Sequence, residues 1–315
     1  MKAILLILII VIFKIVTCFS QSQVEINDEQ YYGQKPPGAI PEIYKPKFSF
    51  LQGIEYNDLV FSPGGMELCF SIKDTSTKLT CIYYLKKEKG NWTNPEKAYF
   101  IPNNSTGDLP QFSPDSKRFS YTYKGDFWSC IKKDDKWTMA EKMSEPVCTK
   151  EYECGFSFAK SGSIYFASSG RPDGKGHCDI YYSALKNSRF EMPQNLGNLN
   201  TDASECVVSV SPDEKYIVFT RFLLKDGQNA TDLYISFRKQ NGEWTLAQKL
   251  GPTINSAGAN NNPVFSPDGK YFFFCQFLKT TSGNFEINRY WVSTRMFDDL
   301  RESLFAPLSN DLEQK

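Results

Sequence analysis

One short phrase recurs five times along this chain, and it constrains the fold more than any other feature. Each copy is an apolar residue followed by a tight-turn sequence, most often Ser-Pro-Asp. The copies are Phe61-Ser62-Pro63-Gly64-Gly65, Phe112-Ser113-Pro114-Asp115-Ser116, Phe158-Ala159-Lys160-Ser161-Gly162, Val210-Ser211-Pro212-Asp213-Glu214 and Phe265-Ser266-Pro267-Asp268-Gly269. Their first residues are 51, 46, 52 and 55 positions apart, so each copy has room for a four-stranded sheet and its loops.

The chemistry of the phrase is that of a hairpin turn. Proline fixes φ at an early turn position, aspartate caps the turn with its side chain, and glycine tolerates the left-handed conformation. Strand formers stand on both sides, such as Leu59-Val60-Phe61 before the first turn and Leu68-Cys69-Phe70 after it. Each phrase therefore predicts two adjacent, largely apolar inner strands.

Two further strands follow in most copies. The third strands are predicted at residues 81–85, 126–129, 179–183, 232–236 and 288–293. The fourth are predicted at Gly90-Asn91-Trp92-Thr93, Lys136-Trp137-Thr138, Ser188-Arg189-Phe190 and Gly242-Glu243-Trp244-Thr245. Four antiparallel strands per copy make one propeller blade, so the fold class is all-β and the fold a five-bladed β-propeller.

The last copy ends after its third strand, at Ser293. We expect its fourth strand to come from the N-terminal segment, where residues 41–46 precede the first repeat, because such pairing closes the ring and removes an exposed sheet edge. A sixth blade would need a degenerate copy within residues 21–58, which is short for four strands, so six blades rank second. Residues 21–300 are then a single domain and residues 301–315 a polar C-terminal tail.

Residues 1–20 have the pattern of a secretory signal peptide. Lys2 precedes an apolar run from Ala3 to Phe13, and Ser20 precedes the expected cleavage site. The run is too short to span a membrane. A retained anchor and a bacterial lipoprotein signal at Cys18 are the alternatives. We expect a secreted protein, extracellular or periplasmic, with no membrane span after cleavage.

The net charge of the mature chain argues against some partners. Removing Lys2 and Lys14 leaves 34 of the 36 basic residues against 36 acidic ones, a net charge of −2. Nucleic acids and anionic membrane surfaces reward clustered positive charge. Neither is expected as a partner.

Eight cysteines remain after Cys18, and an oxidising compartment would favour disulfides among them. Cys69 and Cys81 flank one predicted hairpin loop, and Cys154 and Cys206 hold equivalent positions in adjacent blades. The alternative is that several are buried apolar residues. Four glycosylation sequons, at Asn91, Asn103, Asn104 and Asn229, fall in expected loops and would be used in a eukaryotic host.

The repeat resembles the WD40-like, TolB-type β-propeller repeat, whose signature is a Ser-Pro-Asp-Gly turn followed by aromatic strands and an Asp-Ile-Tyr strand. The resemblance extends from about Tyr31 to Leu300. Two copies depart from it, since the third lacks the proline and aspartate and the first has Gly64 where aspartate is expected. It implies a secreted or periplasmic propeller, and fold alone does not give function.

Most catalytic constellations are excluded by the single histidine, His177. Its neighbours Cys178 and Asp179 point to opposite sides of an extended chain, so no metal site is expected there. A serine-hydrolase triad lacks its Gly-x-Ser-x-Gly turn, and propeller lyases of pectic oligosaccharides, which resemble this repeat, depend on several histidines. We expect no cofactor. Paired carboxylates of the glycosidase kind remain available.

Five polar residues precede the inner strands by similar intervals: Asp58, Asp108, Glu153, Glu205 and Asn262. In a propeller these positions converge on one mouth of the central channel. The hypothesis is a binding ring for a cation, an amine or a sugar. The alternative is that each side chain ties down loop backbone.

The sequence analysis therefore favours a non-catalytic binding or scaffold protein that recognises a protein or carbohydrate partner. The alternative is a glycan-active, glycosidase-like enzyme that uses carboxylates at the channel mouth. A carboxylate with a raised pKa in a cleft would indicate the enzyme, and fully paired carboxylates would indicate the scaffold.

Overall fold

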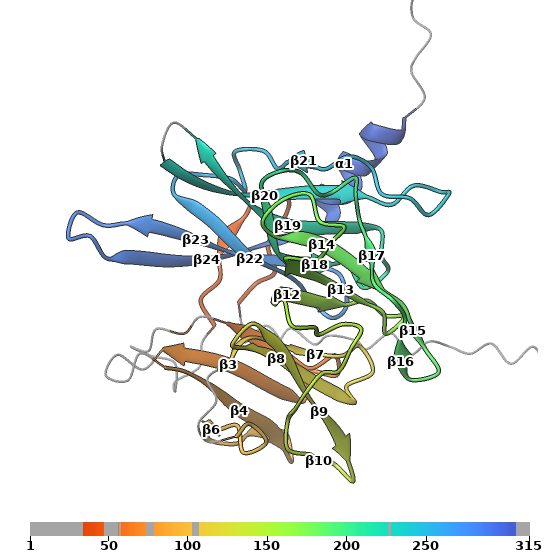
Figure 1. Cartoon of the computed structure of the whole chain (residues 1–315). Coiled ribbons are helices and arrows are strands. Elements are labelled where there is room, and N and C mark those ends of the chain that lie inside the picture. Colours follow the sequence, from red (N-terminus) through yellow and green to blue (C-terminus); the bar gives the residue numbers. More distant parts are fainter. Residues whose placement is uncertain are drawn as a thin grey trace, which may run out of the picture.

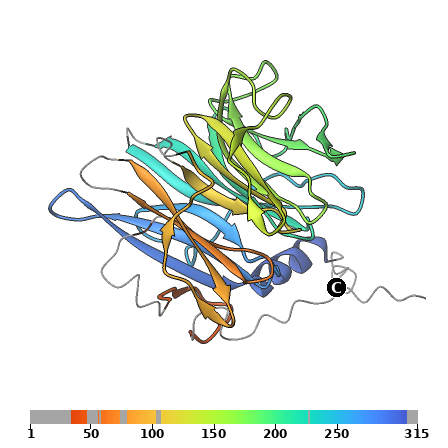
Figure 2. The ribbon, with the colours of Figure 1, turned by 90° about the horizontal axis from the view of Figure 1, so that it is seen from below.

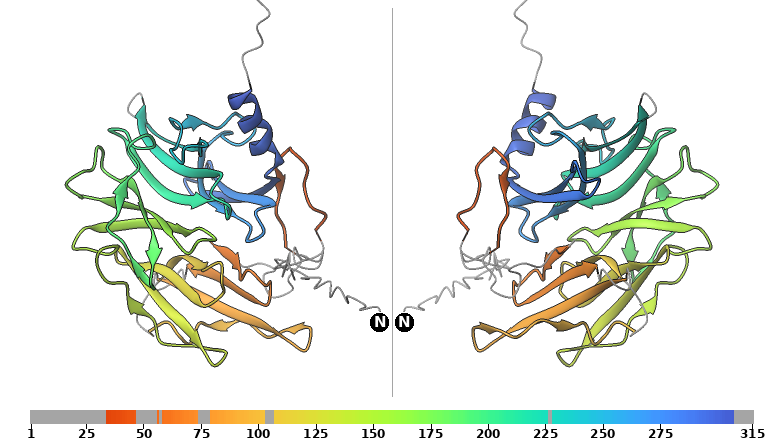
Figure 3. Two further views of the ribbon diagram at one scale, coloured as in Figure 1. Left: turned by 90° about the vertical axis from the view of Figure 1, so that its right-hand side faces the viewer. Right: turned by 90° about the vertical axis from the view of Figure 1, so that its left-hand side faces the viewer.

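The computed structural model describes residues 34–46, 56, 58–73, 79–102, 107–225 and 228–306. These residues form five small antiparallel sheets arranged in a ring, followed by one helix (Figure 1). The views of Figure 3 show the ring and the N-terminal segment beside the last blade. The predictions of an all-β protein and of a five-bladed propeller are confirmed.

The blades follow one another in sequence. All strands of each of the first four come from one repeat, and the fifth takes its outer strand from the N-terminal segment. The first contains β2 (Leu59–Phe61), β3 (Glu67–Lys73), β4 (Thr80–Glu88), β5 (Asn91–Trp92) and β6 (Glu96–Lys97). The second contains β7 (Asp108–Phe112), β8 (Arg118–Tyr123), β9 (Asp126–Lys133), β10 (Lys136–Trp137) and β11 (Glu141–Lys142). The third contains β12 (Tyr152–Phe158), β13 (Ile164–Ser169), β14 (Asp179–Ser183) and β17 (Gln194–Asn195), beside a hairpin of β15 (Leu185–Lys186) and β16 (Arg189–Phe190).

The fourth blade contains β18 (Ser204–Val210), β19 (Tyr216–Lys225), β20 (Gln228–Phe237) and β21 (Gln248–Lys249). The fifth contains β22 (Ala259–Phe265), β23 (Tyr271–Lys279), β24 (Phe285–Ser293) and β1 (Glu42–Ile43).

The repeated turn has the predicted chemistry. In the fifth blade the backbone N–H of Tyr271 donates to Ser266 Oγ at 2.9 Å, and Lys270 N–H donates to Asp268 Oδ1 at 3.1 Å. The residue after the aspartate, Gly269, has a φ of 73°, in the left-handed region. The side chains therefore close the turn that joins each pair of inner strands.

The predicted fourth strands were wrong in position. The tryptophan segments β5 and β10 pair only with the far ends of β4 and β9, as short hairpin extensions. The outermost strand of each blade comes a few residues later, for example where Gln248 and Lys249 pair with Ile235 and Tyr234. Its sequence signal is a proline or alanine followed by Glu or Gln, at Pro95-Glu96, Ala140-Glu141, Pro193-Gln194, Ala247-Gln248 and Pro41-Glu42.

The N-terminal segment completes the last blade, as predicted. Glu42 pairs with Trp291 and Ile43 with Tyr290 in antiparallel register, and Tyr44 N–H donates to Arg289 O at 2.8 Å. The Tyr44 side chain is buried against the rings of Trp291 and Phe273, at centroid distances of 5.1 and 5.2 Å. Figure 2 shows the first blade, in orange, next to the last, in blue.

The helix α1 (Arg295–Phe305) crosses the boundary at residue 300 that was expected to separate the propeller from the tail. Its Phe297 is fully buried against Tyr216, Phe265 and Phe272, which belong to the fourth and fifth blades. The start of the C-terminal segment is therefore packed against the propeller core.

Several predictions fall on residues that the structure does not describe, including the signal peptide (1–20), Asn103, Asn104 and the side chain of Asn229. Asn91 is exposed, at the start of β5. The eight cysteines among the described residues are all free thiols. The Cys69–Cys81 bridge is wrong, because Cys69 is paired with Tyr84 and Cys81 with Ile72, which places them apart along the hairpin. Within the described part of the chain, no helix has the length and apolar character needed to cross a bilayer.

The closure model predicts a difference between two adjacent residues of the N-terminal segment. Tyr44→Ala should lower the free energy of unfolding by about 3 kcal/mol, because it empties a buried aromatic site. Ile43→Ala is the control, since its side chain is 38% exposed. Urea unfolding followed by tryptophan fluorescence measures both, and equal midpoints for the two variants would contradict the closure model.

Candidate functional site

A β-bulge or register shift near the start of four inner strands decides which side chains reach the channel. It lies between Asp108 and Gln111 in β7 and between Cys206 and Val208 in β18, with counterparts in β12 and β22. A bulge adds a residue to one strand and redirects the side chains around it. The five polar residues that the sequence analysis grouped together therefore stand at different levels.

The polar side chains fall into two sets according to their distance from the turn phrase. The first set, called the outer level, stands five residues before the phrase. Glu153, Glu205 and Asn260 occupy it in successive blades, and all three side chains are fully buried. They pair across the hairpin with Ser168, Arg221 and Gln276 respectively.

Glu153 and Glu205 each form an ion pair with a buried arginine. Glu205 Oε1 accepts from Arg221 Nε at 2.6 Å and from Thr201 Oγ1 at 2.7 Å. Glu153 Oε1 accepts from Arg171 Nη2 at 3.2 Å, and burial raises the pKa of this carboxyl although Arg171 lowers it. These carboxylates hold the loops that lead into the inner strands, which is the role that the alternative interpretation gave them.

The inner level lies three residues before the turn phrase and faces the propeller axis. Asp58, Leu109, Val207 and Asn262 stand there and line a cavity of about 140 Å³. Cys275 and Arg289 line the same cavity, which extends along the channel to the prolines of the repeated turns.

Asp58 is the carboxylate most enclosed in this cavity. Ser71 Oγ donates to its Oδ2 at 2.6 Å, and the N–H of Leu109 in the next blade approaches the same oxygen at 3.4 Å. Burial raises the pKa of Asp58, and the Ser71 hydrogen bond and Arg289 oppose that shift without cancelling it.

Asp108, at the start of β7, is the neighbour of Asp58 in the second blade. Burial raises its pKa, the negative charge of Asp58 raises it further, and Thr80 and Lys73 oppose the shift. Two carboxylates with raised pKa values thus belong to adjacent blades, Asp58 at the cavity wall and Asp108 at an exposed position within range of its charge. Such environments are typical of functional sites.

Arg289 provides the positive charge of this site. Its guanidinium donates to the carbonyl oxygen of Tyr56 and lies 4.1 Å from the centre of the Tyr56 ring. The sequence analysis missed it. The available signal was that Arg289 stands where the other third strands have a buried apolar residue, namely Phe127, Ile180 or Leu233.

The structure therefore divides the predicted ring into two parts. Asp58, Asn262 and Arg289 line the cavity, and Asp108 stands outside its lining at an exposed position within range of the charge of Asp58. Glu153 and Glu205 point away into ion pairs.

No family model and no curated protein matches this chain. Solved structures with a similar fold include a protein described as putative TolB from Agrobacterium tumefaciens, 16% identical over 75% of this chain and 80% of that one, with a TM-score of 0.48. The α-L-arabinofuranosidase of Podospora anserina, in complex with cellotriose, is 13% identical over 81% and 97%, with a TM-score of 0.44. An oligogalacturonate lyase in complex with manganese is 13% identical over 76% and 65%, with a TM-score of 0.44.

The comparisons support the resemblance to TolB-type propellers at the level of the fold. The expectation of a non-catalytic binding or scaffold protein is not kept, since the solved structures of similar fold include glycosidases and a lyase. At such low identity the likeness concerns the fold. The chemistry has to be argued from this chain's own residues.

Neutralising substitutions of Glu205 and of Asp58 are expected to have opposite effects on stability. Glu205→Gln should lower the free energy of unfolding by about 3 kcal/mol at pH 7, because it leaves Arg221 buried without its counter-charge. The exposed Glu243→Gln is the control and should leave the melting temperature unchanged. A melting temperature of Glu205→Gln equal to that of the control would contradict a structural role for the ion pair.

Asp58→Asn should raise the melting temperature at pH 7. Because the pKa of Asp58 is raised in the folded state, its stabilising contribution is present below about pH 4, the unfolded value, and is lost as the pH rises through the folded value. Asparagine removes that loss while it can still accept from Ser71. Calorimetry between pH 3.5 and 7 should show a gain that grows with pH, and a gain independent of pH would argue against the raised pKa.

Proposed function

We propose that this protein is a glycan-active hydrolase in which Asp58 and Asp108 carry the chemistry. The observation that carries the proposal is that two carboxylates of adjacent blades both have raised pKa values, Asp58 at the wall of the axial cavity and Asp108 within range of its charge. Hydrolysis of a glycosidic bond by the common mechanism needs such a pair, one acid and one base or nucleophile.

Asp58 is assigned the role of general acid. It is the more enclosed carboxyl, and its raised pKa keeps it protonated at a pH at which an ordinary aspartate is ionised. It would donate its proton to the leaving oxygen. Asp108, at the more open position, would act as the base that activates water or as the nucleophile.

Neighbouring side chains supply binding groups for a sugar. Asn262 and Arg289 offer hydrogen-bond donors along the cavity wall, suited to hydroxyl groups. Tyr152, at the start of β12, is 57% exposed, and the negative charge of Asp108 contributes to its raised pKa. Its ring is therefore available to stack on a sugar face near Asp108. The signal peptide expected at residues 1–20 supports an extracellular or periplasmic activity.

The test is hydrolysis of a panel of aryl pentosides, aryl hexosides and plant and microbial oligosaccharides. Asp58→Asn and Asp108→Asn should each lower kcat/KM at least about 100-fold with the fold intact, since proton transfer by a positioned group contributes about 100- to 10,000-fold. Asp134→Asn, in an exposed turn, is the matched control. Full activity of both variants, or no hydrolysis of any member by the parent, would contradict the proposal.

The pH profile gives an independent test. Activity requires protonated Asp58, so the rate should fall on the alkaline side at a pH above the ordinary aspartate value of about 4. An aryl glycoside with a good leaving group needs less protonation, so Asp58→Asn should lose much less activity on it than on an oligosaccharide. An equal loss on both substrates would argue against the acid role.

A further inference from the structure

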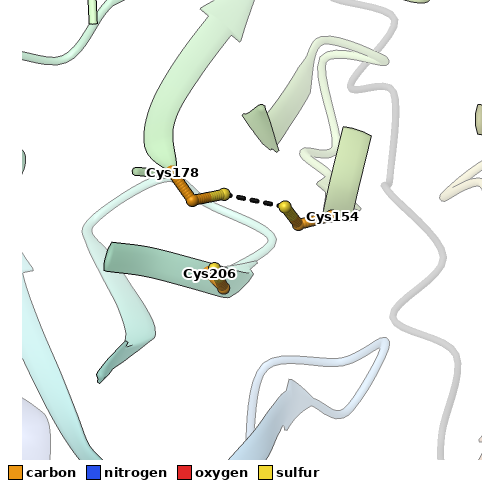
Figure 4. A group of neighbouring side chains, drawn as sticks. All are labelled: Cys154, Cys178 and Cys206. Carbon is orange, nitrogen blue, oxygen red and sulfur yellow. Dashed lines mark hydrogen bonds between the residues drawn. The ribbon is translucent and has the colours of Figure 1, made fainter. Parts of the chain in front are cut away.

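Three cysteine side chains from three separate segments converge at the rim of the propeller. Cys154 lies in β12, Cys206 lies at the equivalent position in β18, and Cys178 lies in the loop before β14 (Figure 4). The sulfur atoms of Cys154 and Cys178 are 2.8 Å apart, and all three sulfur atoms lie within 4.8 Å of one another. The sequence analysis considered only a bridge between Cys154 and Cys206 and did not include Cys178.

The backbone holds these positions firmly. Cys154 and Cys206 directly follow Glu153 and Glu205, the two carboxylates fixed by buried arginines. The carbonyl oxygen of Cys178 accepts from Glu205 N–H at 2.8 Å, which ties the Cys178 loop to β18. The cluster therefore lies on a preformed frame that joins the third and fourth blades.

A hydroxyl group adjoins the cluster, since Ser204 Oγ lies 3.4 Å from the Cys206 sulfur. Cys178 is buried, whereas Cys154 and Cys206 are half-buried, so solvent reaches the cluster at these two residues.

A second group, Asp126, Cys148 and Glu153, also brings its ligand atoms within 4.8 Å of one another. Its two carboxylates are already neutralised, since Lys142 pairs with Asp126 at 2.7 Å and Arg171 with Glu153 at 3.2 Å. Among the ion pairs of the described residues, none involves a side chain of the three-cysteine cluster. No side-chain cation therefore competes with a metal ion for its sulfur atoms.

We infer that Cys154, Cys178 and Cys206 form a binding site for one thiophilic metal ion of the Zn²⁺ class. Three thiolates are an established donor set for such ions, and the half-buried side leaves a fourth position for water or an external ligand. Zn–S bonds of about 2.3 Å in tetrahedral geometry separate the sulfur atoms by about 3.8 Å, so binding requires the Cys154 and Cys178 sulfurs to move apart by about 1 Å. Each thiol that binds the ion releases its proton to solvent.

The site is independent of the proposed hydrolase activity and links two blades. A bound ion would cross-link β12, β18 and the Cys178 loop, and so stabilise the folded state by mass action. Its expected role is therefore to fasten the ring between the third and fourth blades.

The test uses reduced, chelator-stripped protein titrated with Zn²⁺ in competition with a chromophoric chelator. We expect one Zn²⁺ per chain, and a loss of affinity above about 100-fold in Cys206→Ser, since outer-sphere partners alone are worth about 10- to 100-fold. Cys81→Ser, also half-buried but in the first blade, is the matched control and should bind as the parent does. Co²⁺ should give a sulfur-to-metal charge-transfer band that Cys206→Ser weakens.

Thermal unfolding keeps the test informative if Cys206→Ser is unstable. Zn²⁺ should raise the melting temperature of the parent and of Cys81→Ser, and should leave that of Cys206→Ala unchanged. Unchanged Zn²⁺ affinity in Cys206→Ser, no stoichiometric uptake by the parent, or a Cys154–Cys178 disulfide found by peptide mapping of unreduced protein from its native compartment would each overturn the inference.

Discussion

Closure of the ring is the constraint on which the rest of this structure depends. Five twisted sheets surround one axis only if the last sheet acquires an outer strand, and β1 supplies it by pairing with β24. Tyr44 then packs between Trp291 and Phe273, and the Tyr44 N–H bond fixes the backbone at Arg289. The same strand pairing that removes an exposed sheet edge thus helps to position the arginine of the candidate site.

Bulges at the starts of the inner strands divide the polar residues of the channel mouth by role. On one side of the bulge, Glu153 and Glu205 are turned into the blades, where arginines neutralise them. On the other side, Asn262 of the fifth blade faces the cavity, and Asp58 faces it from the first blade, for which no such register shift is described. Two positions along a strand, with the bulge between them, thus separate a structural ion pair from a group available for chemistry, because the bulge interrupts the alternation of side-chain direction.

The structural and the candidate functional carboxylates differ in how favourable their ionised form is in the folded protein. Glu205 is surrounded by donors, so its charge is stabilised where it lies. Burial raises the pKa of both Asp58 and Asp108, so the ionised form of each is disfavoured in the folded state. Carboxylates with perturbed pKa values are enriched at functional sites, which is why the proposed function assigns its chemistry to these two residues of the first and second blades.

The sequence by itself determined the repeat, the number of blades, the turns and the closing segment, because these depend on local turn chemistry and on short-range alternation of strand formers. It misplaced the outer strands, since a tryptophan hairpin and a two-residue edge strand look alike without their pairing partners. It grouped Asp58 with Glu205 because a bulge leaves no distinct sequence signal. Only the tertiary structure brought Arg289 to Asp58, and Cys178 to Cys154 and Cys206, because these contacts join segments from different blades or distant loops, and their spacing is set by how the blades pack around the axis.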